Sequence, residues 1–263
     1  MATLTIAAAA SLLPALQDMQ PELERLFPFD DQFIIDGSSG SLVNQIVNGV
    51  IHPDIFISAA LEPMEELVDE GFVTSGKEAP LLRNSLVLIR NKVNTPATQN
   101  IISFNQVTYD NTTAKNVRIY IPEPETVGGV VYEVPAGRYA RRAFNYFGNW
   151  AFAGQAAHRL DDDTPAAPIF SVARARNLVA GRTTSAAIGT VYFTDAMTAP
   201  WRDSLEIIAI APPSVNSDII YPIAPLSASP ISSHVMTNIL NFIKGDGIHY
   251  FYDRGFLPLI SAN

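Results

Sequence analysis

The sequence predicts an α/β fold in two lobes, each with a mostly parallel sheet flanked by helices. In the first third of the chain, short runs rich in β-branched and aromatic residues alternate with segments of helical periodicity, which is typical of β-α-β units. A polar, irregular stretch at residues 93–117 ends this block, and a second alternation follows it. Two such blocks indicate two lobes with a ligand cleft between them.

The first block begins and ends with a short apolar strand. We expect strands at residues 4–9, 31–36, 54–58 and 85–90, and helices at 11–27, 41–51 and 62–71. The opening LTIAAAASLLPAL lacks a basic leader and continues into an amphipathic pattern. We therefore expect it to be folded structure and not a signal peptide.

The second block shows the same alternation, with glycine at the helix ends. Gly148 and Gly181 each close a predicted helix, a position that glycine commonly occupies. The expected strands are 117–122, 186–196 and 218–226, and the expected helices are 135–148, 170–181 and 229–245.

Composition narrows the classes of function. The 263 residues include 17 Lys and Arg against 26 Asp and Glu, and this net charge of -9 argues against a nucleic-acid surface. Cysteine is absent from the sequence, which excludes disulfides, thiolate metal sites and a cysteine nucleophile. Polar residues interrupt every hydrophobic stretch before it reaches the roughly 18 residues that a membrane span needs.

The stretch GSSGS at residues 37–41 precedes a predicted helix and contains only small and hydroxyl residues. The first N–H groups of a helix lack intrahelical partners and carry partial positive charge, so a Gly/Ser-rich entry makes an anion site. Glycine permits close approach, and serine adds a hydroxyl donor. Taken alone, the stretch more often indicates a plain N-cap at Ser39 or Ser41.

Three further predicted helices begin in a similar way. Small residues precede Ser11, the segment 135–137 opens a helix without bulky side chains, and a fourth helix starts around residues 171–172. Each lobe therefore contains two candidate helix starts for an anion.

Six blocks of the sequence resemble the molybdate-binding proteins of ABC transporters, in the same order and at similar spacing. They are AAAASLLPALQDM, GSSGSLVNQIVNG, PDIFISA, RNSLVLI, VPAGRYARRAF and GTVYFTDA, and together they extend over almost the whole chain. The resemblance implies a type II periplasmic-binding-protein fold that holds a tetrahedral oxyanion between two lobes. It implies neither catalysis nor a cofactor.

Carried over block by block, the resemblance implies five ligand-binding residues. Ser11 and Ser39 would donate hydroxyl and backbone hydrogen bonds, and Tyr192 would donate its phenol. Ala136 and Val172 would each donate a backbone N–H. All five are neutral donors, which suits a fully ionised dianion such as molybdate, tungstate or sulfate, held through its oxygens alone. Hydrogen phosphate would bring a proton with no acceptor, a mismatch of roughly 1 to 3 kcal/mol.

Two features depart from the pattern of this family. Asp36 precedes the serine loop where an apolar residue is more usual, and we expect its carboxylate to turn away from the anion. The segment 123–133 is longer than in the family and carries Glu123, Glu125 and Glu133, so we expect an extra hairpin or lid there.

Two other classes of function stay open on the sequence. A binding protein of the same fold for a carboxylate or phosphonate would need an arginine for bidentate pairing, and Arg138 and Arg174 are the candidates. A serine hydrolase is the third reading. It is disfavoured because GSSGS lacks the second glycine of the G-x-S-x-G elbow and because the four histidines are dispersed.

The resemblance implies a monomeric, periplasmic or otherwise extracytoplasmic protein that delivers its anion to the membrane permease of an ABC importer. We expect residues 1–84 and 220–263 to form one lobe and residues 85–219 the other. Extended segments near 84–92 and 212–222 would act as hinges between them. The sequence does not separate molybdate from tungstate, because the two anions are nearly equal in size and charge.

Overall fold

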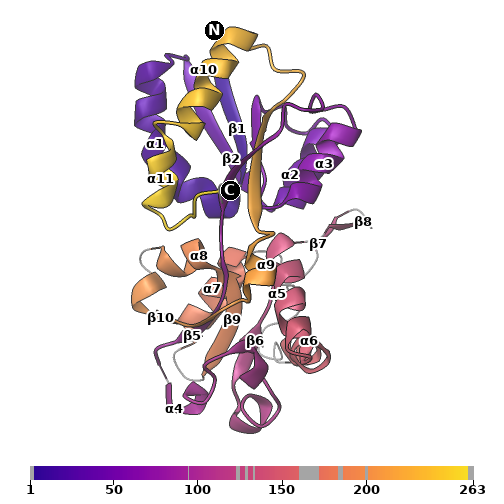
Figure 1. The fold of residues 1–263 in the computed structure, drawn as a ribbon, viewed down its shortest axis with the longest axis vertical. Coiled ribbons are helices and arrows are strands. Elements are labelled where there is room, and N and C mark those ends of the chain that lie inside the picture. Colours follow the sequence, from indigo (N-terminus) through magenta and orange to yellow (C-terminus); the bar gives the residue numbers. More distant parts are fainter. Residues whose placement is uncertain are drawn as a thin grey trace. The chain divides into compact units, whose positions relative to one another are not determined.

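The structure is a computed structural model that describes residues 3–93, 95–122, 125–127, 130–132, 134–159, 172–182, 186–198 and 201–259. The chain forms two compact units (Figure 1). Unit 1 consists of Met1–Asn84 and Ile220–Asn263, and unit 2 of Ser85–Ile219. The chain thus enters unit 2 after Asn84 and returns to unit 1 after Ile219.

Unit 1 is built on a five-stranded sheet in the order β2-β1-β3-β11-β4. Its strands are β1 (Thr3–Ala9), β2 (Asp31–Gly37), β3 (Ile55–Ile57), β4 (Ala79–Arg83) and β11 (Ile220–Pro225). β1 runs parallel to β2 and β3, whereas β11 runs antiparallel to β3 and β4. The three parallel neighbours form one continuous β-α-β-α-β unit.

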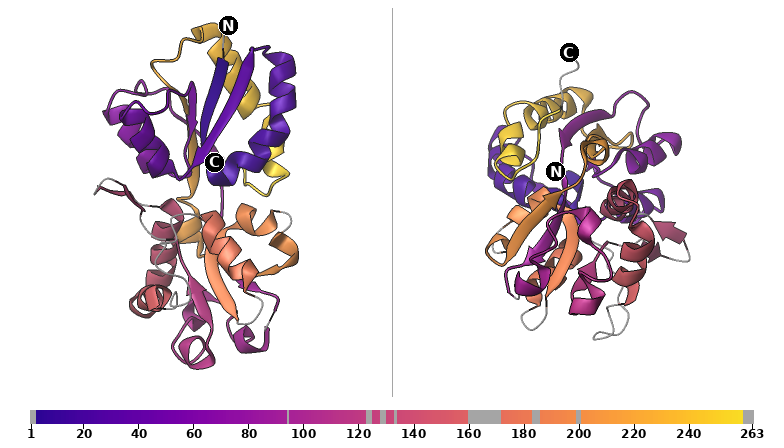
Figure 2. Two further views of the ribbon diagram at one scale, coloured as in Figure 1. Left: turned by 180° about the vertical axis from the view of Figure 1, so that it is seen from behind. Right: turned by 60° about the horizontal axis from the view of Figure 1, so that its bottom comes forward.

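Helices cover both faces of this sheet. They are α1 (Leu13–Leu26), α2 (Ser39–Val47), α3 (Leu61–Asp69), α10 (Ser233–Lys244) and α11 (Ile248–Tyr252), with a 3-10 turn, η1 (Ala10–Leu12), before α1. α1 and α10 both contact α11 on one face, and α2 packs with α3 on the other (Figures 1 and 2). Under α2 and α3, a buried cluster includes Leu42, Phe56 and Leu67.

Unit 2 is built on a four-stranded sheet in the order β10-β5-β9-β6. Its strands are β5 (Leu86–Asn91), β6 (Arg118–Tyr120), β9 (Ala187–Tyr192) and β10 (Leu205–Ile210). β6 and β9 are parallel, whereas β5 is antiparallel to both β9 and β10. A separate antiparallel hairpin joins β7 (Glu125–Val127) to β8 (Val130–Tyr132).

The helices of unit 2 again lie on both faces of the sheet. They are α4 (Thr95–Thr98), α5 (Pro135–Tyr146), α6 (Trp150–Arg159), α7 (Val172–Gly181), α8 (Phe193–Met197) and α9 (Pro213–Asn216), with 3-10 turns η2 (Phe104–Gln106), η3 (Thr113–Lys115) and η4 (Trp201–Asp203). α7 packs over β9 and β5, where Val87, Val179 and Val191 share a buried cluster. α5 covers the other face (Figure 1). After α5, Gly148 adopts φ +73°, which favours glycine.

The prediction of two sheets flanked by helices is confirmed, but the expectation that each is mostly parallel is wrong. Two of the four pairings in the unit 1 sheet are parallel, and one of the three in the unit 2 sheet. Each antiparallel pairing in the two sheets involves β5 or β11, the strands that follow the two passages between the units. Such strands are not joined to their neighbours through a crossover helix, so the rule that makes β-α-β pairs parallel does not apply to them.

Several other expectations can be compared with the structure. The hairpin expected within residues 123–133 is present as β7 and β8. The strand expected at 186–196 ends at Tyr192 and gives way to α8. The edge strands β4 and β10 and the helix α6 were not predicted. The strand expected at 85–90 is present as β5, and its residues are buried.

Candidate functional site

In unit 1, the carboxyl ends of three neighbouring parallel strands meet at one edge of the sheet. Ala9 at the end of β1 is level with Gly37 at the end of β2, and Ala8 is level with Ile57 at the end of β3. Every one of the three strands is followed at once by a short segment of small and hydroxyl residues. In α/β sheets this edge is where ligands bind, so we take it as the candidate anion-binding edge of unit 1.

Ser39 is the first residue of α2, and its side chain is only 1% exposed. Its hydroxyl oxygen accepts a hydrogen bond of 2.9 Å from the N–H of Ala59. Because that bond uses a lone pair, the hydroxyl proton stays available to a ligand. The N-cap is Ser38, whose oxygen accepts from the Ser41 N–H, so the reading of Ser39 or Ser41 as the cap is wrong.

Ser11 lies in the turn η1 and does not cap α1 through its side chain. Its hydroxyl lies 3.0 Å from the phenol oxygen of Tyr221 on β11. That same phenol oxygen accepts a hydrogen bond of 3.2 Å from the side-chain amide of Asn84. The hydroxyl of Ser11 is therefore held by unit 1 itself, through residues far away in the sequence.

Ser58 is a third serine at this edge, and sequence reasoning did not select it. It follows β3 directly, it is fully buried, and its oxygen accepts a hydrogen bond of 3.1 Å from the Ala60 N–H. The signal was present, because SAA after the strand DIFI repeats the small-residue pattern that follows β1. Figure 1 shows α2 and α3 starting side by side from this edge.

In unit 2, Tyr192 is the last residue of β9 and is 2% exposed. Side chains alternate across a strand, and Val191 belongs to the cluster under α7, so Tyr192 points to the opposite face, which α5 covers. The backbone N–H of Phe193 donates to the Ser85 carbonyl, which fixes the end of β9. The phenol is thus placed by the sheet.

Ala136 and Val172 lie in the first turns of α5 and α7. α5 follows β6 and begins with Pro135, without a side-chain cap, so the Ala136 N–H is one of the amides that helix geometry leaves without an intrahelical partner. α7 packs back along β9 and precedes it, so Val172 lies near the carboxyl end of β9. Ser171 lies outside the described residues.

Charged residues near the candidate site could repel an anion or bind a different one. Asp36 is exposed and pairs with Ala8 on β1, which puts its side chain on the face of α1, away from α2. The Arg138 guanidinium lies over the ring of Tyr139, 5.1 Å from its centroid. Arg174 is half-buried in the first turn of α7. The side chains of Glu123, Glu125 and Glu133 lie outside the described residues.

A buried ion pair lies just after Tyr192. Asp195 is 6% exposed, and its carboxylate lies 3.8 Å from Nη1 of Arg176. Burial raises the pKa of Asp195 to about 6, and the attraction of Arg176 offsets this rise only in part. Burial likewise lowers the pKa of Arg176, which lies over the Trp201 ring. The pair belongs to the packing of α7, α8 and η4.

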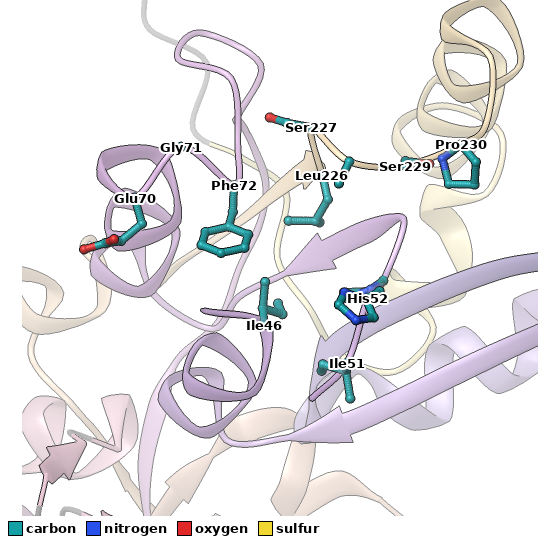
Figure 3. A pocket seen from close by; sticks show the side chains of 12 residues that line it. Ile46, Ile51, His52, Glu70, Gly71, Phe72, Leu226, Ser227, Ser229 and Pro230 are labelled. Carbon is teal, nitrogen blue, oxygen red and sulfur yellow. The ribbon is translucent and has the colours of Figure 1, made fainter. Parts of the chain in front are cut away.

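A well-formed cavity of unit 1 lies elsewhere. It has a volume of about 300 Å³ and a mainly apolar lining that includes Ile46, Phe72 and Leu226, with His52 at one side (Figure 3). Ile46 is in the last turn of α2, the end opposite Ser39. None of the five candidate ligand-binding residues lines this cavity, so its position and chemistry do not match an anion site.

Among the described residues, no group of three or more His, Cys, Asp or Glu side chains could hold a metal ion. Within the same residues, no helix is both long and apolar enough to cross a membrane. His234 and His249 contact Asn238 and the Asp246 carbonyl of their own local segments.

Comparison with known proteins identifies the class. Residues 4–245 match the family model of the bacterial extracellular solute-binding proteins, and the chain therefore belongs to this family. Its members are solute-binding proteins and not enzymes.

Individual relatives include molybdate-binding proteins. The molybdate-binding protein ModA of Escherichia coli K12 is 29% identical over 224 residues, which cover 84% of this chain and 76% of ModA. The periplasmic molybdate-binding protein of Azotobacter vinelandii has a TM-score of 0.68 at 18% identity, with 97% of this chain and 99% of that chain covered. The resemblance expected from the six sequence blocks is confirmed.

The sulfate-binding protein SubI of Mycobacterium tuberculosis H37Rv is as similar in fold. Its TM-score is also 0.68, at 15% identity, with 100% of this chain and 88% of that chain covered. At these identities the structural likenesses show the fold of the periplasmic binding proteins and do not discriminate between anions. The choice of ligand must come from the residues of the candidate site.

Proposed function

We propose that this chain is the extracytoplasmic substrate-binding protein of an ABC importer and that it binds molybdate or tungstate. The observation that carries the proposal is the hydroxyl of Ser39. It is buried at the carboxyl edge of the unit 1 sheet, and its oxygen already accepts the Ala59 N–H, so it offers a proton to a ligand. That is the chemistry that a fully ionised oxyanion needs.

The remaining candidates extend the same donor set. Ser11 would add a second hydroxyl from unit 1, and Tyr192 would add a phenol from unit 2. Ala136 and Val172 would each add a backbone amide at a helix start, where the helix dipole favours negative charge. In this proposal a single anion is bound by donors of both units, without a cofactor and without direct ligands to the metal.

Neutral donors also explain how an acidic protein can bind a dianion. The net charge of -9 acts over the whole surface, whereas affinity at a buried site depends on local dipoles. Neither Arg138 nor Arg174 is needed in this donor set. Because the proposed groups donate and none is an obligatory acceptor, hydrogen phosphate would leave its proton unpaired and should bind poorly.

The partners follow from the class of protein. A substrate-binding protein of an ABC transporter delivers its solute to a membrane permease, and we propose that this chain does so as a monomer in the periplasm or outside the cell membrane. The relatives named as molybdate-binding proteins support this assignment. Sulfate, or a carboxylate with Arg138 or Arg174 as its partner, would be the ligand if the test below excludes molybdate and tungstate.

Isothermal titration calorimetry tests the proposal. We expect ligand-stripped protein to bind molybdate and tungstate one to one, sulfate more weakly and phosphate least. The double variant Ser11→Ala with Ser39→Ala should lose at least about 100-fold in affinity for molybdate, because each hydroxyl bond to a charged group contributes roughly 1.5 to 3 kcal/mol.

A matched control comes from the other end of the same sheet. Ser232 caps α10 and accepts from the Val235 N–H, beside Thr3 and Thr5 at the start of β1. Ser232→Ala should therefore leave the affinity for molybdate unchanged. If the folded wild type binds none of the four anions measurably, the proposal is contradicted.

A further inference from the structure

We infer that Tyr221 and Asn84 are positioning residues that make the Ser11 hydroxyl a donor, and so set the preference for anions without protons. This inference rests on the proposed function and names two specificity-determining residues for the same site. Neither belongs to the five candidate ligand-binding residues. Two side-chain hydrogen bonds connect Asn84 to Tyr221 and Tyr221 to Ser11.

The chemistry of the groups fixes the direction of one of the two bonds. The side-chain Nδ2 of Asn84 can only donate, and it donates to the phenol oxygen of Tyr221 at 3.2 Å. The Ser11 hydroxyl oxygen lies 3.0 Å from the phenol oxygen, and either of the two could be the donor. In the inferred arrangement the phenol, whose oxygen already accepts from Asn84, donates its proton to Ser11. With that bond, one lone pair of Ser11 is used and its own proton is directed to a further acceptor, the bound anion.

The same arrangement is found at Ser39, where the donor is the backbone N–H of Ala59. A hydroxyl whose oxygen accepts a hydrogen bond is polarised and becomes a stronger donor. It also has one lone pair fewer to offer to a protonated ligand oxygen. Ser11 and Ser39 are therefore both biased toward donation by groups of the protein itself.

The phenol cannot easily move away from Ser11. Tyr221 is fully buried, pairs with Leu82 in the sheet, and packs its ring edge-on against Phe256 at 5.2 Å between centroids. Asn84 is 1% exposed and follows β4 directly. Its neighbour Arg83 exchanges two backbone hydrogen bonds with Leu257. The backbone contacts of Tyr221 with β4 and of Arg83 with Leu257 therefore hold the Tyr221 and Asn84 side chains in position.

The substitution Tyr221→Phe tests the inference. Phenylalanine keeps the ring and its contact with Phe256, so the variant should fold, but Ser11 loses its donor. We expect the affinity for molybdate to fall about 10-fold, because the hydrogen bond from Ser11 to the charged anion weakens when Ser11 is no longer biased toward donation. The affinity for hydrogen phosphate should fall less, because the freed lone pair of Ser11 can accept its proton.

The decisive readout is the ratio of the two dissociation constants. Molybdate is titrated by calorimetry, and phosphate is measured by its displacement of molybdate in a mildly alkaline buffer, where it is mainly hydrogen phosphate. We expect the ratio of the phosphate constant to the molybdate constant to fall about fivefold in Tyr221→Phe. A merely structural role of Tyr221 would weaken both anions by the same factor and leave the ratio unchanged, which would overturn the inference.

Two further variants provide a control and a second test. Tyr250→Phe removes another phenol of unit 1, one that donates to Glu22 at 2.9 Å, and should change neither affinity nor ratio. Asn84→Ala should lower the ratio in the same direction as Tyr221→Phe, because the phenol proton is no longer directed to Ser11. A wild type that binds no molybdate would refute the proposed function itself. If the wild type binds molybdate and Tyr221→Phe leaves the ratio of the two dissociation constants unchanged, only this inference is refuted.

Discussion

At the scale of single residues, Asp195 links the stability of the protein to pH. Burial raises its pKa from 3.8 to about 6, and Arg176 offsets this only in part. In the unfolded chain this carboxyl would ionise with a pKa of 3.8. Between pH 3.8 and about pH 6 the folded state therefore binds more protons than the unfolded state. Stability due to Asp195 is therefore fully present below about pH 4 and is lost as the pH rises through 6.

Asp195→Asn removes this titration and keeps the shape of the side chain. We expect the free energy of unfolding of the wild type, minus that of the variant, to be larger near pH 4.5 than near pH 7. Urea denaturation at both values measures it. Asp203→Asn, at a side chain that is 83% exposed, is the control and should show a much smaller change. A difference that stays constant or grows toward neutral pH would refute the raised pKa.

The candidate site could be predicted from the sequence only in part at this scale. Small and hydroxyl residues after a strand indicate an anion site through local chemistry, which a short stretch reveals. The role of each serine depends on distant residues: Ala59 lies 20 residues from Ser39, and Tyr221 lies 210 residues from Ser11. Neither contact leaves a local signal, so the partners of these two serines could not be predicted. Ser58 did have a local signal in the small residues after β3 and was missed nevertheless.

At the scale of elements, β9 depends on a glycine for its packing. A Cβ at Gly189 would lie 2.8 Å from the Tyr120 carbonyl oxygen and 2.8 Å from Cγ2 of Val179. β9 lies between β5 and β6 and under α7, so none of these neighbours can withdraw freely. We expect Gly189→Ala to destabilise the protein by about 1 to 3 kcal/mol, the cost of overpacking a core.

Gly181, the last residue of α7, provides the matched comparison. No described atom lies within 4 Å of a Cβ built there. Gly181→Ala should therefore be neutral or stabilise by up to about 1 kcal/mol through helix propensity. Thermal or urea unfolding of both variants is the measurement. Equal stability of the two variants would show that the contacts around Gly189 do not limit the packing of β9.

The elements that the sequence predicted well are those with a local signal. α1, α2, α5 and α10 show helical periodicity or small-residue starts, and β1, β3 and β5 are mainly apolar. The strands β4 and β10 were missed, and strand direction was misjudged, because both depend on how the chain passes between the units. No periodicity within a segment encodes that arrangement.

At the scale of the whole molecule, the chain passes twice between its two units, after Asn84 and after Ile219. The order of the six blocks predicted the family, because they extend through both units and a single block would have been ambiguous. The likeness of fold extends to sulfate-binding as well as molybdate-binding proteins. The architecture alone therefore does not identify the ligand.

Hydrogen exchange with and without molybdate tests most directly whether donors of both units bind one anion. We expect amide protection near residues 10–13, 38–42 and 58–61 in unit 1, and near 135–138 and 172–175 in unit 2. All five segments should share one midpoint in a molybdate titration, because one binding event orders them. Protection confined to one unit, or absent at saturating molybdate, would contradict the account.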